Sequence, residues 1–185
     1  MKKFLLTFSV TAMLVACQSE PPRIVSDQTV DDVIMGAELC QPVSETTVIR
    51  SFEQAGMQDV HARNFTYGSS SHLMIFPYSD DGLAFGGCRW DYADYCKDAS
   101  GDLYAVVFEN FFKSRKQAME QYKNVTRLVG GKHGKANFIR SKASCTSMWT
   151  DDTNSVGVSV HKDLSHEDKW TCTFYYVNIA LYHSL

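Results

Sequence analysis

One long amphipathic helix, flanked on both sides by strand-like segments, most limits the folds open to this chain. Residues 114–129 begin with a Ser-x-x-Gln capping pattern formed by Ser114 and Gln117. Gly130-Gly131 is expected to end the helix. The apolar stripe at helical spacing consists of Ala118, Tyr122, Val125 and Val129, widened by Met119 and Leu128. A helix with one apolar face buries it against another layer of structure, and the neighbouring segments predict that this layer is a sheet.

The strand-like segments lie before and after this helix. The segments before it are 64–68 and 73–78, which predict a hairpin around a Ser-rich turn, then 83–90 and the strongly apolar 103–112. The segments after it are 136–149, 156–160 and 170–181, with a turn at 151–154. Residues 91–101 are expected to form a polar and aromatic loop. The pattern predicts an α+β fold with a largely antiparallel sheet.

Two short helices are expected before the first strand. Asp27 is the expected cap of a first helix whose stripe reaches Ala37 and which Pro42 ends, and Ser44 is the expected cap of a second one that ends near Gly56. Residues 27–185 show no internal repeat and no linker, so we expect a single domain.

The first residues have the pattern of a secretory signal. Met1-Lys2-Lys3 is cationic, the apolar run that follows is too short for a lasting membrane span, and small Ala16 precedes Cys17. Leu14-Val15-Ala16-Cys17 resembles the lipobox of bacterial lipoproteins, which favours lipidation at Cys17. An ordinary signal peptidase site is the alternative.

That resemblance covers only residues 1–17 and implies nothing about the folded domain. It implies a signal peptide over 1–16, acylation of Cys17, and a tether over 17–26. In that family the residue after the cysteine directs sorting, and Asp there favours the inner membrane. Gln18 therefore favours the periplasmic face of the outer membrane.

Charge limits the partners that we expect. The formal net charge is −3, and loss of the two signal-peptide lysines takes it to −5. This value argues against general nucleic-acid binding, which needs a basic face. After the signal, no apolar run is long enough to cross a membrane. No cofactor is expected.

Five cysteines follow Cys17, and an exported chain is expected to form disulfides. The number is odd, and the sequence leaves the pairing open. Cys88 and Cys96 are the closest pair and the first expectation. In a three-strand meander Cys145 and Cys172 lie about 9.6 Å apart, and a disulfide tolerates about 7 Å. A bond between them therefore requires their strands to be neighbours or to face each other across a bend. Cys40 has no assigned partner. No CxxC spacing is present, so no zinc site is expected.

Two surfaces are candidates for binding. The loop from Cys88 to Gly101 is the first, and its candidate partner-binding residues are Trp90, Asp91, Tyr92, Asp94 and Tyr95. Aromatic residues are frequent in interface hot spots, and the acids suit a cationic protein or a sugar. The alternative is that Trp90 and Tyr92 belong to the core.

The second surface is basic. Residues 113–142 contain nine lysines and arginines and one acid, and the candidate contacts are Lys123, Arg127, Lys132 and Lys135. The alternative is an ordinary solvated helix face.

We identify no catalytic or metal-binding motif. The histidines are scattered, and neither a nucleophile elbow nor a calcium loop is present. The sequence favours a non-enzymatic, lipid-anchored envelope protein that binds another protein, such as an inhibitor or immunity protein against an envelope-degrading enzyme. The alternatives are an accessory subunit of an assembly, secretion or signalling complex, and a small hydrolase whose site is built from distant residues.

Overall fold

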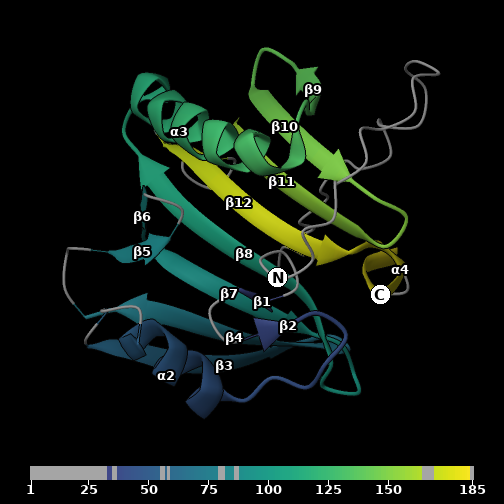
Figure 1. Ribbon diagram of the computed structural model, residues 1–185. Helices are drawn as coiled ribbons and strands as arrows, with labels where there is room; N and C mark the ends of the chain where they lie inside the picture. Colours follow the sequence, from purple (N-terminus) through teal and green to yellow (C-terminus); the bar gives the residue numbers. More distant parts are fainter. Residues whose placement is uncertain are drawn as a thin grey trace.

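The computed structural model describes residues 33–34, 37–54, 57, 59–78, 82–85, 88–163 and 169–183. The expected signal peptide, Cys17 and the tether to residue 26 lie outside the described residues. The described part has an α+β fold built on one open antiparallel sheet (Figure 1). The predicted fold class is therefore confirmed.

Eight strands form the main sheet, and every neighbouring pair is antiparallel. Their order is β3 (Val60–Tyr67), β4 (Ser70–Pro77), β7 (Tyr92–Lys97), β8 (Leu103–Phe112), β12 (Trp170–Asn178), β11 (Asn154–Lys162), β10 (Ser144–Thr150) and β9 (Asn137–Arg140). Two small ladders pair β1 (Val33–Ile34) with β2 (Ala37–Glu38) and β5 (Leu83–Phe85) with β6 (Cys88–Trp90). The described helices are α2 (Glu45–Gln54), α3 (Arg115–His133) and α4 (Ile179–His183).

The order of the elements repeats once along the chain. In each half a helix is followed by four strands of the main sheet that run from one edge to the centre: α2 and β3-β4-β7-β8, then α3 and β9-β10-β11-β12. The last strands of the two halves, β8 and β12, pair with each other. The two halves therefore share a topology, although the sequence contains no evident repeat.

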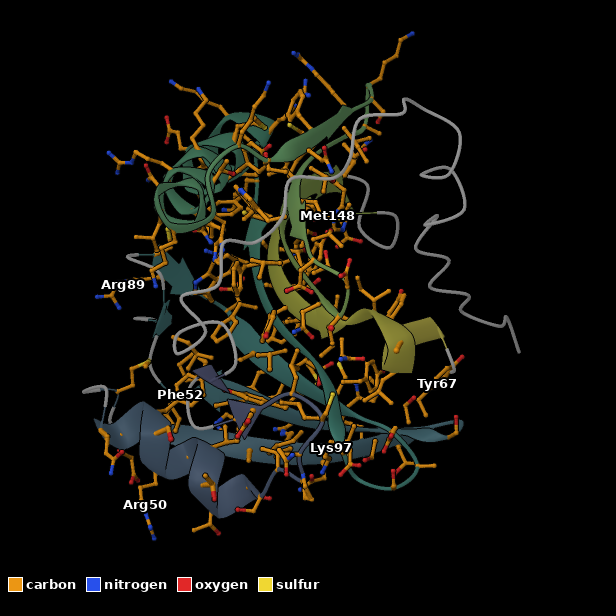
Figure 2. The ribbon with its side chains drawn as sticks, turned by 45° about the vertical axis from the view of Figure 1, so that its right-hand side comes forward. Arg50, Phe52, Tyr67, Arg89, Lys97 and Met148 are labelled. Carbon is orange, nitrogen blue, oxygen red and sulfur yellow. The ribbon has the colours of Figure 1, made fainter. Side chains whose placement is uncertain are left out.

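Helices α2 and α3 pack on the same face of the sheet, which we call the helix side (Figure 1). Val48 and Phe52 of α2 join a buried cluster that also contains the stripe of α3 and alternate residues of the strands. Figure 2 shows Phe52 directed from α2 toward the sheet. The Tyr122 hydroxyl shares a 2.6 Å hydrogen bond with Ser147 Oγ of β10, which ties α3 to the second half of the sheet.

Helix α3 confirms the predicted cap and stripe, except that Leu128 is 49% exposed and does not widen the stripe, and the helix ends later than predicted. Ser114 is the N-cap, and its Oγ accepts a 3.3 Å hydrogen bond from the Gln117 N–H. The helix continues through Gly130-Gly131 because its last turn is held by packing: His133 is buried there. It ends at Gly134, where φ is +77°, a value that glycine adopts without strain.

The N-terminal helices are confirmed only in part. The predicted second helix is α2, and the Ser44 hydroxyl accepts a 3.1 Å hydrogen bond from the Thr47 N–H at its start. The predicted helix over 27–37 is wrong where the structure describes it, because β1 and β2 form a short ladder there. Residues 27–32 lie outside the described residues.

The predicted loop over 91–101 is wrong for its first half. Residues 92–97 form β7, a strand paired with β4 on one side and β8 on the other. Its side chains alternate, with Ala93 and Tyr95 on the helix side and Tyr92 and Asp94 on the other. The polar residues that suggested a loop therefore occupy one face of a strand.

The predicted strand over 83–90 is wrong as one strand, because β5 and β6 pair with each other in a separate ladder. The remaining strand predictions hold with shifted limits. The first hairpin is confirmed as β3 and β4, which turn at Gly68 with φ +62°. The turn at 151–154 is confirmed, since an Asp151 carboxylate oxygen accepts hydrogen bonds from the N–H groups of Thr153 and Asn154. The final strand ends at Asn178, and α4 replaces its predicted last residues.

Candidate functional site

The face of the sheet opposite α2 and α3, which we call the open face, carries the candidate site. In β10, Met148 alternates with Ser147, which bonds to α3, so Met148 faces away from that helix. Figure 2 shows Met148 and α3 on opposite sides of the sheet. Among the described helices, α4 packs on this face through Leu181, at one end only. Much of the open face is therefore available to a ligand or partner.

A row of aromatic rings crosses four neighbouring strands on the open face. It consists of His61 in β3, Phe76 in β4, Tyr92 in β7 and Phe111 in β8, and we call it the aromatic row. The centroid distances along it are 5.4, 5.8 and 6.1 Å, which is the range of favourable ring contacts. Register produces it: His61 pairs with Phe76, and Tyr92 pairs with Glu109, two residues from Phe111.

A cleft of about 380 Å³ opens beside the aromatic row. Its lining includes His61 and Phe76 of the row together with Arg63, Tyr78 and Asp91. Tyr78 packs on His61 with ring centroids 4.5 Å apart, yet 70% of Tyr78 is exposed. The guanidinium of Arg63 lies over Phe76, 5.9 Å from the ring centroid. The cleft therefore presents aromatic walls with one cation and one carboxylate.

Hydrogen bonds hold the middle of the row in place. The Tyr92 hydroxyl donates to Glu109, and the Thr173 hydroxyl donates a 3.2 Å bond to the other oxygen of that carboxylate. Burial, followed by the Glu109 carboxylate, raises the pKa of Tyr92 above its ordinary value, so the phenol stays protonated and keeps donating. The Phe111 N–H donates a 2.8 Å bond to Asp91. The row is therefore pre-ordered.

A second group of side chains lies farther along β4 and β7 on the same face. His72 pairs with Cys96 across the two strands, and Asp94 is two residues before Cys96. His72 Nδ1 and Asp94 Oδ2 are 2.9 Å apart. The hydrogen bond to Asp94 raises the pKa of His72, an effect that burial partly opposes. Burial and then Asp94 raise the pKa of Cys96 well above its ordinary range.

The predicted aromatic loop is only partly at the surface. Trp90 and Tyr95 are 1% and 0% exposed and belong to the core on the helix side, so the prediction that they contact a partner is wrong. Tyr92 lies in the aromatic row, while Asp91 lines the cleft and Asp94 contacts His72. The structure thus divides the predicted site between the two faces of the sheet.

Sequence reasoning missed the other members of the open face: His61, His72, Phe76, Glu109 and Phe111. The alternation at residues 72, 74 and 76 was a usable signal that one face of that strand is separate from the core. The strand pairing that assembles the row is not visible in the sequence.

The predicted basic surface lies elsewhere. Lys123, Arg127, Lys132 and Lys135 are all exposed, on α3 and just after it. Because α3 covers the helix side, these cations are separated from the aromatic row by the sheet. The two predicted surfaces are therefore independent.

The expected disulfides do not form in this structure, and all five described cysteines are free. Cys88 packs against the core of the helix side, whereas Cys96 belongs to the small cluster on the open face. Cys145 and Cys172 both pair with Val160 from opposite sides, so one strand separates them, as in the meander considered above. Two strand spacings of about 4.8 Å exceed the reach of a disulfide. Cys40 is exposed.

Within the described residues, no helix combines the length and the apolar character that a membrane crossing needs. The chain matches no known family model, and neither a curated protein nor a solved structure is significantly similar to it.

Proposed function

We propose that this protein is a lipid-anchored envelope protein that binds another protein through the open face of its sheet. The lipobox-like residues before Cys17 support the anchor, and Gln18 favours the periplasmic face of the outer membrane. The observation that carries the binding proposal is the aromatic row with its cleft. Large aromatic groups on a rigid support bind with little loss of conformational entropy.

An inhibitor or immunity protein is the specific form of this proposal. Such a protein needs a preformed surface that matches one enzyme, and the hydrogen bonds behind Tyr92 and Phe111 supply that order. Asp91, Asp94 and Glu109 place acids on the same face, which suits a cationic envelope-degrading enzyme.

A non-enzymatic role is favoured over a small hydrolase. A hydrolase needs an activated nucleophile, and a cysteine is activated as the thiolate. Cys96 lies beside His72 and Asp94, but its raised pKa keeps the thiol protonated.

An accessory subunit of an envelope complex is the second candidate. Its support is the pair of outer strands, β3 and β9, which are the edges of the sheet. Phe65, Tyr67, Phe138 and Ile139 on these strands are exposed apolar residues. An unpaired strand edge can accept a strand from a partner.

The proposal is tested by affinity capture from envelope extract with the full-length protein as bait. Tyr78→Ala and Phe111→Ala are each expected to weaken capture of the partner by about tenfold or more, as hot-spot truncations do. Phe138→Ala is the control, because it removes an aromatic ring on the helix side whose exposure, 58%, lies between the 37% of Phe111 and the 70% of Tyr78. Capture that is unchanged in the first two variants rejects the open face. Loss of capture in Phe138→Ala, or when Lys123 and Arg127 are replaced, supports the accessory-subunit candidate.

A further inference from the structure

We propose that His72, Asp94 and Cys96 form a binding site for a divalent transition-metal ion of the zinc type. The proposal does not depend on partner binding, although Asp94 is also one of the acids named above for the partner: its test measures metal binding directly. Imidazole nitrogen, carboxylate oxygen and thiolate sulfur are the three ligand types that zinc takes in proteins.

Strand pairing brings the three ligands together. His72 lies opposite Cys96. Asp94 is two positions before Cys96 in the same strand, so both side chains point to the same face. One ligand atom from each residue lies within 4.8 Å of the other two. Ligand atoms around a tetrahedral zinc ion are about 3.3–3.6 Å apart, given bonds of about 2.0–2.3 Å. Small side-chain rotations therefore complete the geometry.

The Asp94 carboxylate supplies a second observation. Its Oδ1 atom is buried without a donor in good hydrogen-bond geometry, Oδ2 contacts His72, and the Cys96 thiol lies beside the same carboxylate. A buried carboxylate oxygen without a donor is costly, and most buried polar atoms have a partner. A metal ion between Asp94 and Cys96 would satisfy this oxygen.

The surroundings of Cys96 suit a metal–thiolate bond. A shift of strand register at Cys96 and Lys97 places Tyr104 and Ala105 in one cluster with Cys96, and Leu181 of α4 packs against that cluster. The sulfur is thereby shielded from solvent, whereas the His72 side chain is 24% exposed and provides the entry side. On binding, the Cys96 S–H bond breaks, its proton leaves to solvent, and the sulfur electron pair forms the metal bond.

Three protein ligands leave one tetrahedral position for water or an added ligand. The site therefore resembles an open zinc site in coordination number, rather than a closed four-ligand structural site.

Cobalt(II) is the probe for the test, because a cobalt–thiolate bond gives a near-ultraviolet charge-transfer band. Full-length protein, kept reduced with a phosphine, is titrated with Co²⁺ and then with Zn²⁺. We expect one equivalent of Co²⁺ to produce the band and Zn²⁺ to abolish it. His72→Gln and Asp94→Asn should each weaken binding by about tenfold or more, the scale seen when even outer partners of a site are removed.

Two cysteine variants separate this site from incidental thiol binding. Cys96→Ser should lose the band, whereas Cys40→Ser, which removes an exposed thiol outside the cluster, should keep it. A band that is absent from the wild type, that survives Cys96→Ser, or that is lost in Cys40→Ser overturns the proposal.

X-ray absorption of the zinc-loaded wild-type protein provides a test that needs no substitution. One sulfur and one imidazole in the first coordination shell are expected. A shell of oxygen and nitrogen atoms without sulfur overturns the proposal, even if Cys96→Ser fails to fold.

Discussion

Phe108 and Phe174 lie directly opposite each other at the centre of the sheet, with ring centroids 6.2 Å apart. Their strands are equivalent, because β8 and β12 are the last strands of two halves with the same topology. An antiparallel pair of equivalent strands implies an approximate two-fold axis that is perpendicular to the sheet and passes between β8 and β12. The two phenylalanines join these strands on the helix side.

Phe108→Ala is expected to destabilise the fold by about 3–5 kcal/mol, the usual range for truncating a buried phenylalanine. The Phe108 ring also packs against Phe52 and Trp90, so the truncation removes contacts from α2 and from the small β5–β6 ladder. Urea denaturation measures the change. Phe138→Ala, at a position that is 58% exposed, should stay within about 0.5 kcal/mol of the wild type. Equal losses in the two variants would contradict the assignment of the core.

Gly157→Ala is expected to destabilise the protein by about 1–3 kcal/mol through overpacking. Gly157 in β11 lies opposite Tyr175 in β12, and a Cβ there would be 2.0 Å from Cζ of the Tyr175 ring. The ring must therefore move, although it is partly buried.

A double-mutant cycle checks this cause. In a Tyr175→Ala background the same Gly157→Ala change should cost much less, which gives a coupling energy of about 1 kcal/mol or more in urea denaturation. Additive effects would show that the cost comes from the backbone of β11 instead.

The free energy of unfolding should decrease as the pH falls below neutral, because His161 becomes protonated more readily in the unfolded chain. Burial lowers the pKa of His161 below its ordinary value of 6.5, although Glu109 and Asp163 partly oppose this. The unfolded chain thus takes up the proton first, so the loss begins as pH falls through about 6.5 and stops once the folded form is also protonated. Above that window the imidazole is neutral in both states and has no effect.

His161→Gln removes this titration. The unfolding free energy of this variant should decline less than that of the wild type between about pH 7 and pH 5. If the unfolding free energies of the variant and the wild type decline equally between these pH values, other groups cause the decline.

Under mild oxidation, peptide mapping without reduction is expected to show no Cys88–Cys96 bond. The two cysteines belong to clusters on opposite sides of the sheet, and the sheet would have to open to join them. Detection of this crosslink in soluble, folded protein would contradict the placement of β6 on the helix side.

Features set by neighbours in the sequence were predictable. The capping of α3 by Ser114 and Gln117 and the turn at Asp151 depend on residues a few positions apart, and both predictions were correct. The end of α3 was not predicted, because Gly130-Gly131 would stop an isolated helix, whereas the buried last turn with His133 sustains this one.

Features set by the order of strands were not predictable. Tyr92 and Asp94 suggested a loop by composition, but pairing on both sides makes the segment a central strand. The aromatic row joins rings from four strands, and the metal-ligand group joins two, so neither exists before the sheet has formed.

The common topology of the two halves fits the shared side of α2 and α3, and among the described helices only α4 packs on the other side. A rotation about a line normal to a sheet leaves a helix on the side where it started, so halves related in this way place both of their helices on one side. Along β7, Ala93 and Tyr95 belong to the core, while Tyr92 and Asp94 lie on the open face. In such a scaffold, the alternate residues on one face can be substituted to suit a new ligand, while those on the other face continue to stabilise the fold.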